Sequence, residues 1–193
     1  WLNPKPSIGL AASGTGNIPP FTAVNSTNGT ITVKINYRAT PCSSSPTQLT
    51  IIIEPALVVN PQSAILVCEG AQIAASNFTS NVAGSTFTWT NSNTSIGLSL
   101  SGTGNFATFT AQNSSSQNQV STLSVKAQTA FCNSTAVNYT ITVKPTPLLN
   151  LPSSLVTCAG SSIAATTFSS IPAGASFTWA NSNSNIGLAA SGN

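Results

Sequence analysis

Four cysteines are the residues of this chain best suited to do chemistry, and they are placed periodically. Cys42 and Cys132 are 90 residues apart, and so are Cys68 and Cys158. Zinc needs four converging ligands, but the chain has no His and no Asp to complete such a set. An even, periodic cysteine count in a chain of secreted-type composition instead predicts disulfides, which form in oxidising compartments.

Two pairings of these cysteines fit the sequence. In the first, which is simpler and slightly favoured, Cys68 bonds to Cys132 within one repeat and stabilises the fold by about 4 kcal/mol. Its difficulty is that the turns carrying the two residues lie at opposite ends of a standard sandwich, whereas a disulfide spans roughly 7 Å between Cα atoms. In the second pairing, a cysteine of one repeat bonds to a cysteine of the next and joins the repeats covalently.

The other ionisable residues do not form a catalytic set. Without His or Asp, Ser-His-Asp and Cys-His catalysis are excluded. Glu54 and Glu69 are the only carboxylates, and 90 residues later their places are taken by Lys144 and Ala159. The paired carboxylates of glycoside hydrolases and the acidic clusters of calcium sites are therefore missing. We expect no enzyme activity, no metal and no cofactor.

The glycines at 102–104 predict a tight turn, because no lysine or helix follows to make a phosphate loop.

The few charges also limit the partners. Charged residues make up 4% of the chain, against roughly a quarter in ordinary soluble domains. The five Lys and Arg give a net charge of +3 but are scattered, whereas nucleic acid requires a dense basic stripe. No apolar run approaches the roughly 20 residues of a membrane-spanning helix. The expected partners are neighbouring repeats of the same or an identical chain, with surface glycans or proteins as further candidates.

The elements that position these residues recur along the chain. Residues 84–93 recur at 174–183, and residues 96–105 recur at 8–17 and at 186–193. A fixed period of this kind is the mark of a repeat architecture.

The register of the repeats divides the chain into three units. Residues 1–55 are the C-terminal part of one repeat, 56–145 a complete repeat, and 146–193 the N-terminal part of the next. Prolines at the boundaries 54–57 and 144–147 stop a sheet ladder and stiffen the short links. We therefore expect a window on a longer, semi-rigid array.

Alternation of apolar and polar residues predicts strands throughout the complete repeat. Phe87 and Trp89, with their counterparts Phe177 and Trp179, are predicted to lie in the core, with sugar stacking as the minor alternative for Trp89. The predicted strands cover 57–67, 71–78, 85–90, 96–100, 106–111, 120–127 and 136–144. Seven short strands separated by turns predict an all-β fold of tandem immunoglobulin-like Greek-key sandwiches of about 90 residues, arranged as a rod.

Residues 88–98 and 101–105, with 67–70 and 140–145, resemble a known family. These are the PKD-like, immunoglobulin-like repeats of very large surface proteins in Bacteroidota. The resemblance covers essentially the whole chain, but in true PKD domains the tryptophan is followed by Asp-Phe-Gly-Asp-Gly, where this chain continues from Thr90 with Asn-Ser-Asn. It implies export across the outer membrane, often by the type IX system, an extracellular location, and roles in adhesion, gliding or surface filaments. It defines no binding residue.

Three functions are compatible with these features. The first is a structural stalk or filament segment of a large secreted adhesin, which spaces or displays adhesive domains. The second is a binding module that uses the polar loops at 91–95 and 112–119 to recognise a glycan or protein. The third is a filament subunit joined to identical chains by strand exchange. Seven Asn-X-Ser/Thr sequons also occur, at Asn25, Asn28, Asn77, Asn93, Asn113, Asn133 and Asn138.

Overall fold

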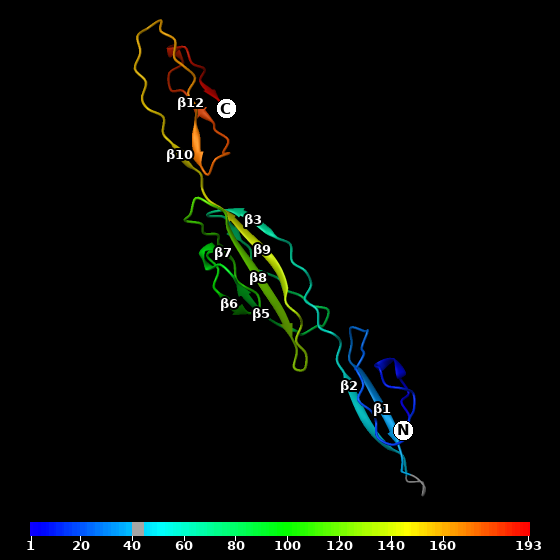
Figure 1. Cartoon of the computed structure of the whole chain (residues 1–193). Helices are drawn as coiled ribbons and strands as arrows, with labels where there is room; N and C mark the ends of the chain where they lie inside the picture. The colour runs from blue at the N-terminus through cyan, green and yellow to red at the C-terminus, as the bar shows by residue number, and fades with distance from the viewer. Residues whose placement is uncertain (40–44) are drawn as a thin grey trace.

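The protein has an all-β fold made of several sheets. The structure, a computed structural model, describes residues 1–39 and 45–193, so Cys42 lies outside the described residues. Figure 1 shows three groups of strands that follow one another from the N-terminus to the C-terminus. Within the described ranges, the only helices are three short 3-10 turns.

The middle unit is built on a five-stranded sheet. Its strand order is β3-β9-β8-β5-β6, in which β3 runs parallel to β9 and the other neighbours are antiparallel. The strands are β3 (Ile65–Cys68), β5 (Thr86–Asn91), β6 (Ser101–Thr103), β8 (Gln119–Gln128) and β9 (Val137–Lys144). The long β8–β9 hairpin alternates buried and exposed residues, as a strand pair with one face on the core must.

A second, smaller sheet closes the other side of the middle unit. It pairs β4 (Gln72–Ile73) with β7 (Phe109–Thr110), and a single bridge joins Val59 to Ser80. Ile73, Phe78 and Phe106 from this side pack with Leu123, Val125 and Ile141 of the large sheet in one buried cluster. The middle unit is therefore a two-layer sandwich with a continuous core.

The first unit holds a hairpin and the segments that precede it. β1 (Ile31–Tyr37) pairs antiparallel with β2 (Thr47–Ile53), and a 3-10 turn, η1 (Pro6–Ile8), lies before them. Ile8 and Leu10 pack on Val33 and Ile35 in a second buried cluster.

The third unit contains the elements that form the N-terminal part of a repeat. β10 (Leu148–Asn150) pairs with β11 (Ser169–Ile171), and β12 (Trp179–Ala180) pairs with β13 (Ser191–Gly192), with η3 (Ser184–Ile186) between the last two. The pairing of Leu149 with Ser170 reproduces the bridge of Val59 with Ser80 one period earlier. Many of its apolar side chains are exposed, among them Leu151, Leu155, Val156, Ile163, Ile186 and Leu188.

Four of the predicted strands differ in the structure, and of the one at 106–111 only β7 (Phe109–Thr110) pairs in a ladder. The predicted strand at 96–100 is replaced by the 3-10 turn η2 (Thr94–Ile96), because the Asn93 side chain caps it and Gly97 turns the chain in the left-handed region. The predicted strand at 57–67 is divided between the two sheets, with β3 crossing to the large one. Of the predicted strand at 71–78, only β4 pairs in a ladder.

Candidate functional site

In all three units, a tryptophan ring packs closely against a glycine. A Cβ atom added to Gly102 would come within 2.4 Å of Trp89 Cζ2, well inside van der Waals contact. The same holds for Gly14 with Trp1, at 2.2 Å, and for Gly192 with Trp179, at 2.4 Å. The glycine at 102 therefore recurs because the ring needs its space. Only Gly104 of the predicted turn has a positive φ, of 67°.

The aromatic residues predicted for the core occupy corresponding places. Trp89 is 5% exposed and packs edge-on against Phe106, so its ring is not available to stack on a sugar. Phe87 is half-buried against the same cluster. Phe177 and Trp179 are also only half-buried among the residues that the structure describes.

An asparagine follows each tryptophan by two residues and holds the η turn, and it is buried in the first two units. Asn91 is 1% exposed, and its Nδ2 donates to the carbonyls of Leu98 and Ser99 at 2.8 and 3.1 Å. Its Oδ1 accepts from the Asn93 amide and the Ser121 hydroxyl. Asn3 and Asn181 make the corresponding bonds to Leu10 and Leu188, respectively. The asparagine side chains of the loop at 91–95 therefore form their hydrogen bonds within the repeat.

The loop at 112–119 is fixed in the same way. Asn113 is 2% exposed, and its Nδ2 donates to the carbonyls of Gln117 and Val143, both at 2.8 Å. In the first unit, Asn25 bonds likewise to Gly29 and Ile53. Asn91, Asn93 and Asn113 of the two loops proposed for ligand binding therefore fix these loops within the repeat, a structural role the sequence did not reveal.

The cysteines of the middle unit lie at opposite ends of the large sheet. Cys68 pairs with Lys144 at the last residue of β9, whereas Cys132 lies in the turn before β9 begins at Val137. Seven strand steps of about 3.3 Å separate these ends by about 23 Å, which no disulfide spans. Cys68, Cys132 and Cys158 are accordingly free. The predicted bond between Cys68 and Cys132 is wrong for this structure, and the bond between repeats stays a prediction.

Cys68 faces the junction with the third unit. It lines a cavity of about 530 Å³ together with Lys144 and Pro145 from its own end of the sheet, and with Pro172 to Ala175 from the next unit. The position suits a bond between neighbouring repeats, because the counterpart of Cys132 in a following repeat would belong to the turn at this junction.

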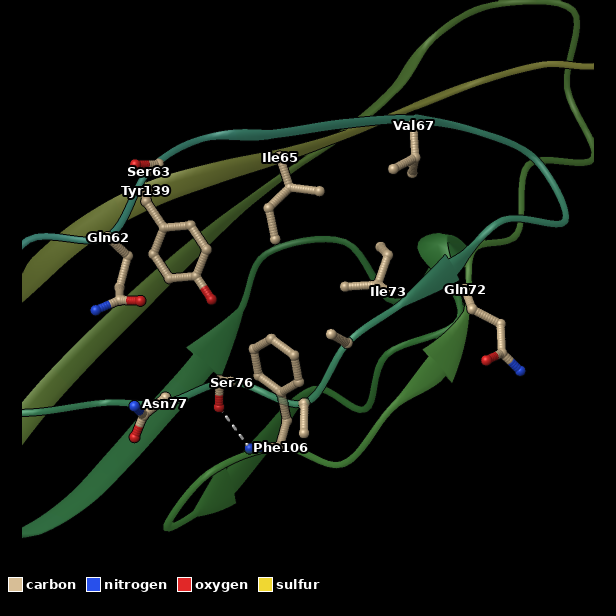
Figure 2. Close-up of a pocket in the computed structure, with 12 residues that line it drawn as sticks. Gln62, Ser63, Ile65, Val67, Gln72, Ile73, Ser76, Asn77, Phe106 and Tyr139 are labelled. Atoms are coloured by element: carbon tan, nitrogen blue, oxygen red, sulfur yellow. Dashed lines mark hydrogen bonds between the residues drawn. The ribbon is translucent and has the colours of Figure 1, made fainter.

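A second cleft, of about 290 Å³, opens on one side of the middle unit between its two sheets. In Figure 2, Ile65 and Val67 of β3 face Ile73 and Phe106 across it, and the Tyr139 ring lies at one end. Phe106 and Tyr139 are 4% and 7% exposed, so neither presents an open aromatic face. The cleft is a gap between the two sheets at the edge of the core, and its lining contains no charged residue.

Tyr139 is the one described group with a clearly shifted pKa. Burial raises the pKa of its phenol to about 12, because the charged phenolate loses its hydration in the core. A phenol that stays protonated at every physiological pH takes no part in acid–base chemistry there.

The described residues contain no cluster of three or more His, Cys, Asp or Glu that could hold a metal ion. None of their helices has the length and apolarity to cross a bilayer. No protein-family model matches the chain, and neither does any curated protein sequence.

Proposed function

We propose that this protein is a structural segment of an extracellular shaft, which spaces or displays the adhesive domains of a large secreted bacterial surface protein. The observation that carries this proposal is the recurrence of one packing unit. The tryptophan–glycine contact and the asparagine that holds the neighbouring turn occur in all three consecutive units. Apart from the cysteines, the residues that repeat are those that build a core and its turns.

Each complete repeat is an immunoglobulin-like, PKD-like Greek-key sandwich. The strand order β3-β9-β8-β5-β6 supports this, since immunoglobulin sandwiches place the last two long strands beside the strand that carries the core tryptophan. The first strand of the complete repeat, predicted at 57–67, also divides between the two sheets.

The repeats are joined as a semi-rigid rod. At the first junction, Asn81 Nδ2 donates to Asn28 Oδ1 of the first unit at 3.4 Å and to the Ala56 carbonyl of the link at 2.9 Å. At the second, Glu69 accepts a bond of 3.3 Å from the Thr146 amide. These bonds, added to the prolines of the links, restrict the angle between neighbouring units.

The extracellular location rests on composition and resemblance. A chain with 4% charged residues and an even, periodic cysteine set suits an oxidising exterior, and the PKD-like motifs point to the surface of Bacteroidota cells. The binding-module alternative has less support, because Asn91 and Asn113 of the candidate loops form their hydrogen bonds within the repeat.

Deleting one repeat from the full-length protein tests the proposal. Removal of 56–145 in frame should leave ligand binding by the protein unchanged and shorten it by one repeat, as measured in electron micrographs. A matched control keeps the repeat and changes only the exposed loop residues Gln117 and Asn118 to alanine. Loss of binding in both variants would instead identify the repeat as a binding module.

A further inference from the structure

The cleft of about 290 Å³ in the middle unit lies where the first strand of the repeat leaves the small sheet. Val59 is bridged to Ser80 in an antiparallel pair. The next residue, Asn60, still donates its amide to the Thr79 carbonyl at 2.9 Å. Pro61 follows and ends this ladder, because proline has no N–H to donate. The chain then crosses to the large sheet, where β3 pairs with β9, and it leaves the edge of the small sheet at 72–77 without a neighbouring strand.

The backbone along this edge is unpaired. β4 pairs with β7 on its other side, with Ile73 opposite Phe109. Just after β4, the backbone groups of Ala74 and Ala75 form no hydrogen bond with any described residue. Both alanines are exposed, and both line the cleft. The edge therefore offers backbone donors and acceptors of the kind that pair with an incoming strand.

The inside of the cleft is apolar, with one unpaired hydroxyl. Ile65 and Val67 of β3 line one wall. Tyr139 is 7% exposed, and its hydroxyl points into the cleft (Figure 2) and bonds to no described residue. Packing does not require a hydroxyl at this position of the repeat, since 90 residues earlier it is occupied by Leu49. The buried hydroxyl can therefore serve as a polar contact for a molecule that enters the cleft.

We propose that the cleft binds an extended, uncharged peptide segment of a partner protein, which pairs with the edge at 72–77 as an added strand of the small sheet. The edge is about 20 Å long, which matches a segment of about six residues. Every second side chain of this segment enters the cleft. These side chains are apolar, apart from one Ser, Thr or Asn that bonds to the Tyr139 hydroxyl. A charged side chain is rejected, because the lining contains no charged residue to pair with it.

The unpaired backbone favours a peptide over a small molecule. A small apolar molecule could fill the cleft, but it would leave the amides of Ala74 and Ala75 bonded to water alone. An added strand supplies both with partners and fills the cleft with its side chains. This inference goes beyond the proposed shaft, because it gives the side of the repeat a partner of its own.

Selection from a displayed library of random seven-residue peptides, with the purified 193-residue chain as target, tests the proposal. The enriched peptides should carry uncharged, mostly apolar residues at alternate positions. Their synthetic copies should bind Ala74→Glu at least about tenfold more weakly, because the new carboxylate would be covered without a partner. Ala74 is exposed in the free chain, so this variant should fold normally. Ala136→Glu, at another exposed alanine of the same unit and outside the cleft, is the matched control and should bind as the unchanged chain does.

N-methylation of a selected peptide tests the backbone pairing. Alternate amides of an added strand face the edge, so methylation of one alternate set should weaken binding at least about tenfold, and methylation of the other set should not. The Ala74 amide should also exchange its hydrogen more slowly in the complex, as measured by NMR.

Three results would overturn the inference: a selection that enriches no peptide, equal binding to the two glutamate variants, or equal binding of the two methylated sets. The last result, combined with weak binding to Ala74→Glu, would identify a site for side chains or small molecules and not for a strand. The repeat-deletion test measures a different contact, that of the adhesive domains with their ligand, so the two proposals fail independently.

Discussion

The change of Gly102 to alanine isolates the contact that all three units share. The new Cβ would lie 2.4 Å from Trp89 Cζ2, where carbon atoms normally approach to about 3.5 Å. The ring has little room to retreat, because Phe106 packs against it with ring centroids 6.0 Å apart. The added methyl must therefore displace β6 or the ring.

The cost of this overpacking should be about 1–3 kcal/mol. For a domain of this size, that lowers the melting temperature by about 4–8 °C for each kcal/mol. Gly29→Ala is the control, because a Cβ there meets nothing within 4 Å and the φ of Gly29 is not positive. The control should be neutral or stabilising by up to about 1 kcal/mol.

Hydrogen exchange read by mass spectrometry on β5 and β8 assigns the effect to the middle unit. A double-mutant cycle then tests the cause, since Trp89→Phe removes the ring atoms that the alanine would meet. The double variant Gly102→Ala with Trp89→Phe should lose clearly less stability than the two single changes summed. Strict additivity, or a neutral Gly102→Ala, would refute the packing explanation for the repeated glycine.

Three further predictions follow from the buried polar groups. Asn91→Ala should destabilise the middle unit by about 1–3 kcal/mol in urea unfolding, because it leaves buried carbonyls unpaired, whereas Asn77→Ala at an exposed site should not. The phenol of Tyr139 has its pKa raised from 10.0 to about 12 in the folded state, so the unfolded chain loses this proton first and stability should fall as the pH rises from 10 to 12. Tyr139→Phe should remove that part of the alkaline loss, and an unchanged pH profile would contradict the burial argument. When the chain is secreted by a cell that glycosylates sequons, peptide mass spectrometry should find sugar on the exposed Asn77, Asn133 and Asn138 but not on Asn113, whose Nδ2 is bonded inside the fold.

The long hairpins of this protein could be predicted from its sequence. Strands at 120–127 and 136–144 are found as β8 and β9, because a strand with one face on the core must alternate polar and apolar residues. The alternation with threonine around Trp89 likewise predicts correctly that this residue is buried.

Features that depend on contacts between distant residues could not be predicted in this way. The sequence at 96–100 alternates like a strand, but the Asn93 cap and the left-handed Gly97 convert its start into a turn. The role of Asn113 depends on a carbonyl 30 residues away, at Val143. The bond of Cys68 with Cys132 was favoured because they share a repeat, although their turns were already expected at opposite ends of the sandwich, and the direction of β9 places them there.

Small-angle X-ray scattering of the chain, at concentrations low enough to keep it monomeric, tests the central claim most directly. Three units in a row, each about 34 Å long from the rise of a ten-residue strand, make a rod of about 100 Å with a radius of gyration of about 29 Å. A compact globule of 193 residues would have a radius of gyration of about 16 Å. The shaft account predicts a value near 29 Å with the profile of a folded rod. A value near 16 Å would contradict it.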